Sequence, residues 1–316
     1  MSIDVAFSIE IEDFLDADRA YEFFWAGKIT DKKAFLCPGE NCMAQVTCAN
    51  LDEESQNMKV VPHFRVYGKH DEQCEIFRKV PLKITELIVS AQAAEKKSVD
   101  LSVVDTFSLK RPDSYYESKN SNRDNIEKSV LERKRYITKN TSYNLKQIGT
   151  IGKLYSVRTI VGRYLRYISD DSLKNRRINV KGQDIPYSSF LKSVWEQSLK
   201  SLPEYDIVYY GWAYVDRYEK GYKIKFKKGF KDNEGKILQA SFFVSDKIID
   251  KYPIKNLMIR RLAKISSMAK PTGFVFIYGK PKYFKSPKTG KEYINFDMFN
   301  LDFIDINKES PLPTRR

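Results

Sequence analysis

The sequence has 316 residues but only four cysteines, two histidines and three tryptophans. It lacks any run of about 18 apolar residues, which excludes an apolar membrane-spanning helix. Residues 1–18 are acidic, which argues against a secretory signal, and we therefore expect a cytoplasmic protein. Internal repeats are also lacking, so a repeat architecture is not expected.

The sequence motifs of several large enzyme classes are absent as well. There is no Walker A loop and no Gly-x-Gly-x-x-Gly, His-Glu-x-x-His or Gly-x-Ser-x-Gly element. Both histidines lie within residues 37–74, so none remains elsewhere for acid–base catalysis. Asp297, Asp302 and Asp305 have two interpretations, a divalent-cation site or, more commonly, surface acids at the end of a strand. We expect a protein that is not an enzyme.

Acidic residues are the minority, and their distribution is uneven. The chain has 41 Asp and Glu against 55 Lys and Arg, a formal net charge of +14. Residues 1–100 carry a net charge of −6, whereas residues 101–316 carry +20. A strong positive field concentrates polyanions, so we expect nucleic acid to contact the C-terminal two-thirds, the alternative being that the charge serves solubility alone. A hydrophobic content of 42% excludes a wholly disordered chain.

All the cysteines and histidines lie within residues 37–74. Four residues separate Cys37 from Cys42, and they include a Pro-Gly pair that can form a tight turn. Three residues separate His70 from Cys74, a spacing that one helical turn accommodates. Clustered thiols and imidazoles in a protein without export signals indicate zinc more often than disulfides.

The predicted zinc ligands are Cys37, Cys42, His70 and Cys74. Four protein ligands close the coordination tetrahedron, and such sites are structural because catalysis needs an open position. Cys48 lies in an alternating stretch and is predicted to be a buried strand residue. Two alternatives remain open: His63 replaces His70 as a ligand, or the thiols are ordinary buried side chains.

A longer series of residues accompanies these ligands. In chain order it comprises Asp18-Arg19-Ala20, Ala26-Gly27, Phe35-Leu36-Cys37-Pro38, Cys42, Pro62-His63-Phe64-Arg65, His70 and Cys74. The series covers residues 15–78, about a fifth of the chain. It resembles the N-terminal zinc-finger module of the competence protein CoiA-like family and of related bacterial proteins.

The resemblance implies work on DNA. In that family a nuclease-like domain of the restriction-endonuclease type follows the zinc finger. This chain has no Glu-Ser…His continuation after Cys74 and no acidic pair followed by Glu-x-Lys, so no catalytic residue is carried over. The expected setting is bacterial or phage DNA processing, recombination or anti-phage defence. A metal-dependent nuclease is the alternative.

The element pattern predicts an α+β protein with four parts. These are a zinc-finger module over residues 1–80, a partly polar connector over 81–140, a basic helical region over 141–202 and a β-barrel over 203–308. In the basic region a helical period runs from Thr141 to about Ile168. A hairpin is expected around Lys181. A second helix is expected to begin at Ser188 or Ser189 and to run through Phe190, Val194 and Leu199.

The C-terminal part has the element order of an OB-fold, a five-stranded Greek-key barrel. Three strands, a helix and two strands are expected at 207–215, 222–226, 238–244, 246–268 (interrupted at Pro253), 274–278 and 293–303. Gly211 is expected at the bend of the first strand. The alternation of residues 222–226 places lysines on the wet face of the second strand.

OB-folds bind oligonucleotides on strands two and three and on two flanking loops. We expect single-stranded DNA, or a junction with duplex, to bind there, with stacking on aromatic rings and phosphate contacts to basic residues. The zinc-finger module is expected to hold the fold or to contact a protein partner. The alternative is a protein–protein adaptor whose barrel and zinc finger both bind proteins. The predicted binding residues are Arg163, Arg166, Arg176, Arg177, Arg217, Tyr218, Lys223, Lys225, Lys227, Lys282, Tyr283, Phe284, Lys285, Lys288 and Lys291.

Overall fold

The computed structural model describes residues 2–3, 5–39, 42–53, 62–72, 74, 104–116, 153–169, 171–195, 197–287 and 290–313. These residues form two compact units. Unit 1 takes the described parts of Met1–Asp52, Pro62–Val103 and Pro112–Gly152, and unit 2 those of Glu53–Val61, Val104–Arg111 and Lys153–Arg316. The predicted connector lies mostly outside the described residues, so the four-part division stays a prediction.

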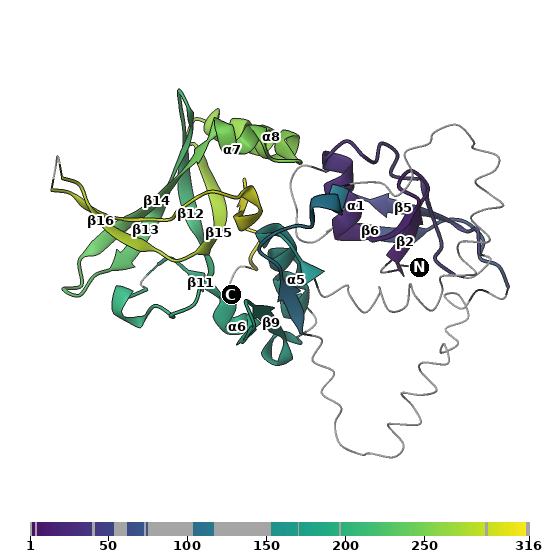
Figure 1. Cartoon of the computed structure of the whole chain (residues 1–316), viewed down its shortest axis with the longest axis horizontal. Helices are drawn as coiled ribbons and strands as arrows, with labels where there is room; N and C mark the ends of the chain where they lie inside the picture. Colours follow the sequence, from purple (N-terminus) through teal and green to yellow (C-terminus); the bar gives the residue numbers. More distant parts are fainter. Residues whose placement is uncertain are drawn as a thin grey trace, which may run out of the picture. The chain divides into compact units, whose positions relative to one another are not determined.

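Unit 1 is built on one sheet with all its ladders antiparallel, in the order β1-β6-β5-β4-β2-β3. Its strands are β1 (Ser2–Ile3), β2 (Val5–Ser8), β3 (Asp13–Asp16), β4 (Phe35–Leu36), β5 (Gln45–Ala49) and β6 (His63–Val66). The helix α1 (Ala17–Trp25) follows β3 directly (Figure 1). The Asp16 carboxylate accepts a hydrogen bond from the Arg19 N–H at 2.8 Å, so it caps the helix.

A short 3₁₀ turn, η1 (Asp113–Tyr116), packs on α1 within the same unit. The Tyr115 ring stacks on Phe23 at 6.0 Å between centroids. The Tyr115 hydroxyl donates to the buried Glu22 carboxylate at 2.8 Å. This bond gives Glu22 a partner inside an otherwise apolar helix face.

Unit 2 contains a small mixed sheet in the order β10-β9-β7-β8. Its strands are β7 (Asp105–Phe107), β8 (Lys153–Leu154), β9 (Arg177–Val180) and β10 (Gln183–Pro186). The helix α5 (Val157–Ser169) and the 3₁₀ turn η2 (Leu173–Asn175) lie between β8 and β9 in the chain. The fully buried Asp105 carboxylate accepts hydrogen bonds from the hydroxyls of Tyr167 at 2.8 Å and Tyr187 at 2.7 Å. These bonds fix α5 and the residue that follows β10 to β7.

The hairpin predicted around Lys181 is confirmed by the antiparallel pairing of β9 with β10. The predicted helical period begins outside the described residues, and α5 covers its last part. The second predicted helix is wrong in extent. The helix α6 (Tyr187–Phe190) follows Pro186 and ends after one turn, because the next residues form β11 (Leu191–Ser193), which pairs with β12. Ladder hydrogen bonds override the local helical preference there.

The large sheet of unit 2 follows the order β16-β17-β14-β13-β12-β15-β18, with β11 on β12. Its long strands are β12 (Ile207–Tyr218), β13 (Gly221–Lys231), β14 (Ile237–Ser245) and β15 (Thr272–Gly279). Three shorter strands complete it: β16 (Lys282–Lys285), β17 (Glu292–Asn295) and β18 (Ile304–Asn307). The 3₁₀ turns η3 (Leu199–Ser201) and η4 (Leu301–Phe303) precede β12 and β18.

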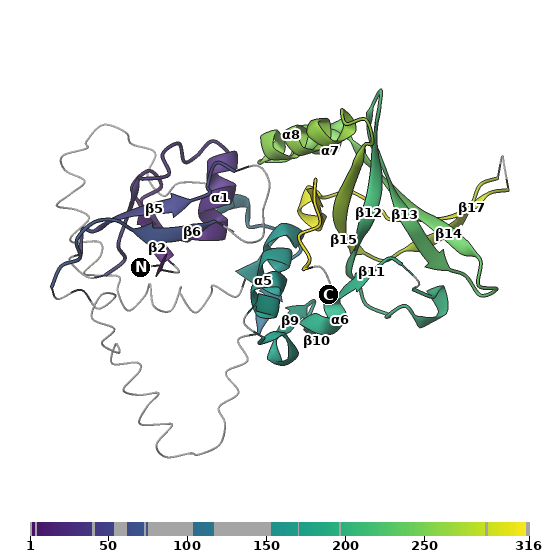
Figure 2. The ribbon, with the colours of Figure 1, turned by 180° about the vertical axis from the view of Figure 1, so that it is seen from behind.

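The strand β12 is shared between two neighbours. Residues 207–214 pair with β15, and residues 213–218 pair with β13. The predicted helix and its interruption at Pro253 are confirmed as α7 (Asp246–Asp250) and α8 (Lys255–Ser266). Both views place these two helices together at one end of the long strands, while the β16–β17 hairpin lies on the side away from α5 (Figures 1 and 2).

The α+β class is confirmed, but the count of five barrel strands is too low. The chain after Gly279 forms a separate strand, β16, where a loop is predicted, because its residues pair with β17. The last predicted strand is divided into β17 and β18 by η4. Among the described strands the hydrogen-bonded path runs from β16 to β18 without closing. Of the described helices, none is both long and apolar enough to cross a membrane.

Candidate metal centre and ring–lysine face

The first two predicted ligands lie in a turn after β4. The Cys37 N–H donates to the Ala44 carbonyl at 2.9 Å, and the Cys42 N–H donates to the Gly39 carbonyl at 3.1 Å. The Gly39 N–H lies 3.5 Å from the Cys37 Sγ. These bonds fold the Pro-Gly segment so that both thiols face the same point, as the spacing predicts.

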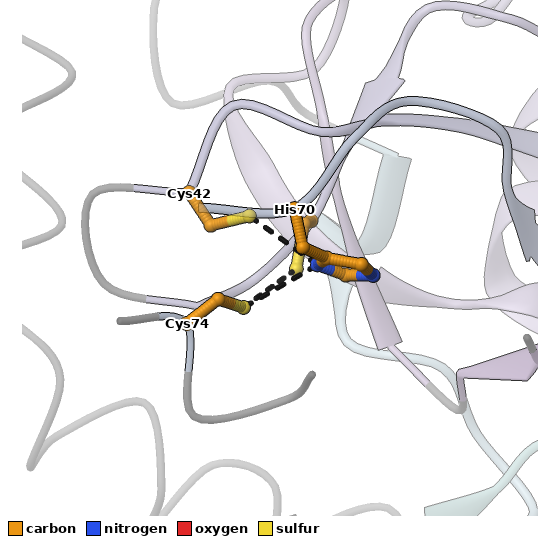
Figure 3. A group of neighbouring side chains, drawn as sticks. Cys42, His70 and Cys74 are labelled. Carbon is orange, nitrogen blue, oxygen red and sulfur yellow. Dashed lines mark hydrogen bonds between the residues drawn. The ribbon is translucent and has the colours of Figure 1, made fainter. Parts of the chain in front are cut away.

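The other two ligands follow β6. The Cys74 N–H donates to the Asp71 carbonyl at 3.1 Å, which closes a turn between His70 and Cys74. His70 Nδ1 lies 3.4 Å from the Sγ of Cys42 and 3.4 Å from the Sγ of Cys74. Figure 3 shows the labelled side chains of Cys42, His70 and Cys74 pointing toward one another.

The four ligand atoms form one cluster. The Sγ atoms of Cys37 and Cys74 are 3.7 Å apart, and all four atoms lie within 4.8 Å of one another. The three thiols are buried. Burial, together with the nearby thiols of Cys42 and Cys74, raises the pKa of Cys37. A cation at the centre supplies the charge that favours thiolates in such a place, so the cluster could hold a metal ion.

The remaining cysteine and histidine lie outside the cluster. Cys48 is a buried residue of β5, as predicted, and its pKa is raised by burial and by the acidic Asp18 and Asp16. His63 Nε2 accepts a hydrogen bond from Arg65 Nε at 2.8 Å. Of the two predicted alternatives for the histidine ligand, the structure brings His70 to the thiols.

A second candidate site lies on the large sheet of unit 2. The strand β13 carries a β-bulge between Lys225 and Gly229, where its register with β14 shifts. A bulge re-aims side chains, and here it exposes two successive residues, Lys227 and Lys228. Lys225, Lys227 and Lys228 each lie over an exposed ring, and we call the set of these lysines and rings the ring–lysine face. Its residues are Trp195, Trp212, Tyr214, Lys225, Lys227 and Lys228.

The ammonium groups of this face lie over its rings. Lys227 Nζ is 5.7 Å from the Trp212 ring centroid and 5.2 Å from that of Tyr214. Lys225 Nζ is 5.5 Å from Tyr214, and Lys228 Nζ is 5.4 Å from Trp195. The rings nonetheless remain accessible, with exposed fractions of 56% for Trp195, 40% for Trp212 and 39% for Tyr214. Exposed tryptophan and tyrosine beside lysine are unusual on a surface that binds nothing.

The lysines of this face form no ion pair within the part of the chain that the structure describes. Among the described residues, no carboxylate lies within ion-pairing distance of Lys225, Lys227 or Lys228. Lys223, the next predicted residue on β13, is half-buried, and burial lowers its pKa. The predicted Tyr218, at the end of β12, is exposed.

The predicted residues of the β16–β17 hairpin are differently placed. Tyr283 and Phe284 are exposed, and Phe284 stacks on Tyr293 at 5.9 Å. Lys282 pairs with Asp297, and Lys285 lies 3.8 Å from the Glu292 carboxylate. Part of the positive charge of the hairpin is therefore balanced locally. Lys291 is exposed, and Lys288 lies outside the described residues.

The predicted arginines also have local partners. Arg163 lies 3.4 Å from Asp105, and Arg177 lies 3.6 Å from Asp184. Arg217 donates two hydrogen bonds to Asp246, at 2.7 and 3.0 Å. Arg176 donates to Ser172 and lies over the Tyr167 ring. The side chain of Arg166 lies outside the described residues.

Two of the three C-terminal acids are buried rather than on the surface. Asp302 accepts hydrogen bonds from Arg111 at 2.7 and 2.8 Å and from the Tyr252 hydroxyl at 2.8 Å. Asp305 pairs with the buried Arg261 at 2.7 Å. The surface interpretation of these two acids is corrected, because each is neutralised inside unit 2 by a guanidinium.

Four residues of the ring–lysine face are absent from the predicted set: Trp195, Trp212, Tyr214 and Lys228. The alternation of β12 places Trp212 and Tyr214 on the same side as the lysines of β13, and this signal was available in the sequence. No family model, curated protein or solved structure matches the chain. The functional inference therefore depends on the two sites themselves.

Proposed function

We propose that the protein is a zinc-containing protein that binds single-stranded nucleic acid, with DNA as the expected ligand. The observation that carries this proposal is the ring–lysine face, where three exposed rings lie beside three lysines that form no ion pair with any described carboxylate. Rings offer stacking surfaces of about 1–3 kcal/mol per base, and ammonium groups offer phosphate contacts. Exposed rings beside basic groups favour nucleic acid over a protein partner.

The arrangement of the large sheet supports an OB-fold-like barrel as part of this proposal. The strands β12, β13 and β14 are consecutive, α7 and α8 follow, and β15 returns beside β12. The strand β17 pairs in parallel with β14, and only two residues separate β15 from β16. This short connection joins β16, at one end of the sheet path, to β15, the strand next to the other end, as expected of a partly open barrel.

Zinc is the metal that best fits the cluster of Cys37, Cys42, His70 and Cys74. Ideal tetrahedral zinc has S–S and S–N edges of about 3.8 and 3.6 Å. The observed Cys37 Sγ–Cys74 Sγ separation of 3.7 Å and Cys42 Sγ–His70 Nδ1 separation of 3.4 Å are close to these values. Three thiolates and one imidazole leave no open position, so the zinc would stabilise unit 1 rather than catalyse a reaction.

The CoiA-like resemblance supports a setting in bacterial or phage DNA processing, recombination or anti-phage defence. It covers only residues 15–78, about a fifth of the chain, and it brings no nuclease residues. We therefore propose binding without cleavage.

The proposal is tested by a salt titration of the full-length protein with labelled oligo(dT). Affinity should fall linearly with salt on a log–log scale, and K225Q/K227Q/K228Q should weaken binding at low salt by about tenfold or more. The matched control K247Q/K251Q/K255Q removes the same charge from the exposed lysines of the α7–α8 region and should change the affinity much less.

Three outcomes would contradict the proposal. Salt-insensitive or absent binding would remove nucleic acid as the ligand. Cleavage of the oligonucleotide with Mg²⁺ or Mn²⁺ would favour the nuclease alternative. A protein partner that heparin and DNA fail to displace would favour the adaptor alternative. Tighter binding of oligo(U) would reassign the ligand from DNA to RNA.

A further inference from the structure

The ring–lysine face has a property that a simple basic patch lacks, because its ammonium groups lie over the ring faces on which bases would stack. Lys227 is close to both Trp212 and Tyr214, and Lys225 is close to Tyr214. A base cannot occupy the same face of a ring as an ammonium group. Binding at these rings therefore requires the lysines to move.

The rings themselves are positioned for a flat ligand. Trp212 contacts Phe274 edge-on, with centroids 5.6 Å apart and an interplanar angle of 85°. Trp212 is paired with Phe274 across the β12–β15 ladder, so this contact is part of the sheet. The indole is thus held from one side while 40% of its surface remains accessible.

The spacing of the two rings determines which conformation of a nucleic-acid strand can stack on both of them. Trp212 and Tyr214 are two residues apart on one face of β12, which places their Cα atoms about 6.6 Å apart. Stacked bases in a helix are about 3.4 Å apart along each strand, roughly half that distance. Two neighbouring bases can meet both rings only when the strand is extended and its bases are unstacked.

We infer that two neighbouring bases of an extended single strand stack on Trp212 and Tyr214, displacing the ammonium groups of Lys227 and Lys225 from the rings to the phosphates. This inference depends on the proposed function and specifies where and how the strand is bound. Each lysine exchanges a cation–π contact for a phosphate contact. Because only the phosphate contact is strongly weakened by salt, the exchange has a measurable signature.

The signature is that the curves of oligo(dT) affinity against salt concentration cross for the wild type and K227Q. In the full-length protein K227Q should lose one phosphate contact, which reduces the slope of log affinity against log salt by about 0.7. At low salt K227Q should bind oligo(dT) more weakly than the wild type. At high salt K227Q should bind about two- to fivefold more tightly than the wild type, because Trp212 is already uncovered and the cation–π contact of Lys227, worth about 0.5–1 kcal/mol at an exposed site, need not be broken.

Ring variants locate the site independently of the lysines. Y214A should weaken oligo(dT) binding by at least about fivefold at every salt concentration, whereas Y214F, which keeps the ring, should bind like the wild type. A duplex of the same length should be insensitive to Y214A. Circular dichroism of each variant checks that the sheet is intact.

Two results would overturn this inference and leave the proposed function standing. In one, the wild type binds oligo(dT) with salt dependence but Y214A binds equally well. In the other, the K227Q curve stays below that of the wild type at all salt concentrations. Absence of wild-type binding would overturn the proposed function as well.

Discussion

At the scale of single residues, all four cysteines are buried, but only three of them lie in the metal cluster. Cys37, Cys42 and Cys74 lie within reach of one ion together with His70, whereas Cys48 is enclosed by the sheet of unit 1. The sequence predicts this division because ligand spacing is local and strand alternation is local. Replacing a ligand cysteine should therefore change the metal content of the protein, whereas replacing Cys48 should not.

The cluster makes a prediction about metal content. C74S should lose bound zinc. Loss of a residue that only hydrogen-bonds to a metal ligand lowers metal affinity by roughly 10–100-fold, and loss of the ligand itself should lower zinc affinity by more. C48A removes a thiol of equal burial and should retain one zinc per chain. Metal analysis of the purified full-length variants measures both. Equal zinc content in the two variants would contradict the assignment of ligands.

At the scale of elements, the bulge of β13 exposes the side chains of Lys227 and Lys228 to solvent. Without the register shift between Lys225 and Gly229, successive lysines would alternate between the two faces. Gly229 allows the close approach of β14, since a Cβ there would lie 2.1 Å from the Leu238 carbonyl oxygen. The predicted bend glycine, Gly211, has a different environment, because a Cβ there would meet only two Phe226 ring carbons, at 3.6 and 3.9 Å.

These two glycines therefore differ in tolerance to alanine. G229A should destabilise the full-length protein by about 1–3 kcal/mol, because β14 must move away, and should also weaken oligo(dT) binding as Lys227 and Lys228 shift. G211A adds the same methyl group at ordinary contact distance and should cost less than about 1 kcal/mol. Urea denaturation compares the two. A G211A cost equal to that of G229A would show that the first strand, not the bulge, requires glycine.

Features that depend on residues close together in the chain could be predicted from the sequence, and features that depend on residues far apart could not. The alternation that places Lys223, Lys225 and Lys227 on one side of β13 is local, and the structure confirms that pattern. The pairing of Lys282 with Asp297 and of Arg217 with Asp246 depends on how separate elements come together. Sequence reasoning could not tell which basic residues have acidic neighbours, and it therefore gave equal weight to both kinds.

At the scale of the whole molecule, the charge of +14 combines two unlike parts, −6 over residues 1–100 and +20 over the remainder. The metal cluster belongs to unit 1 and the ring–lysine face to unit 2. Structural stabilisation by a metal and capture of a polyanion would then be tasks of separate units. On this account the polyanion binds unit 2, and the metal acts only on the stability of unit 1.

The central claim is tested most directly by ultraviolet crosslinking of oligo(dT) to the full-length protein, followed by mass spectrometry of the crosslinked peptides. We predict crosslinks on β12, at Trp212 or Tyr214, and their loss when unlabelled oligo(dT) or high salt is added. Crosslinks confined to unit 1, or to Tyr283 and Phe284 of the β16–β17 hairpin, would contradict the placement of the single strand on the ring–lysine face.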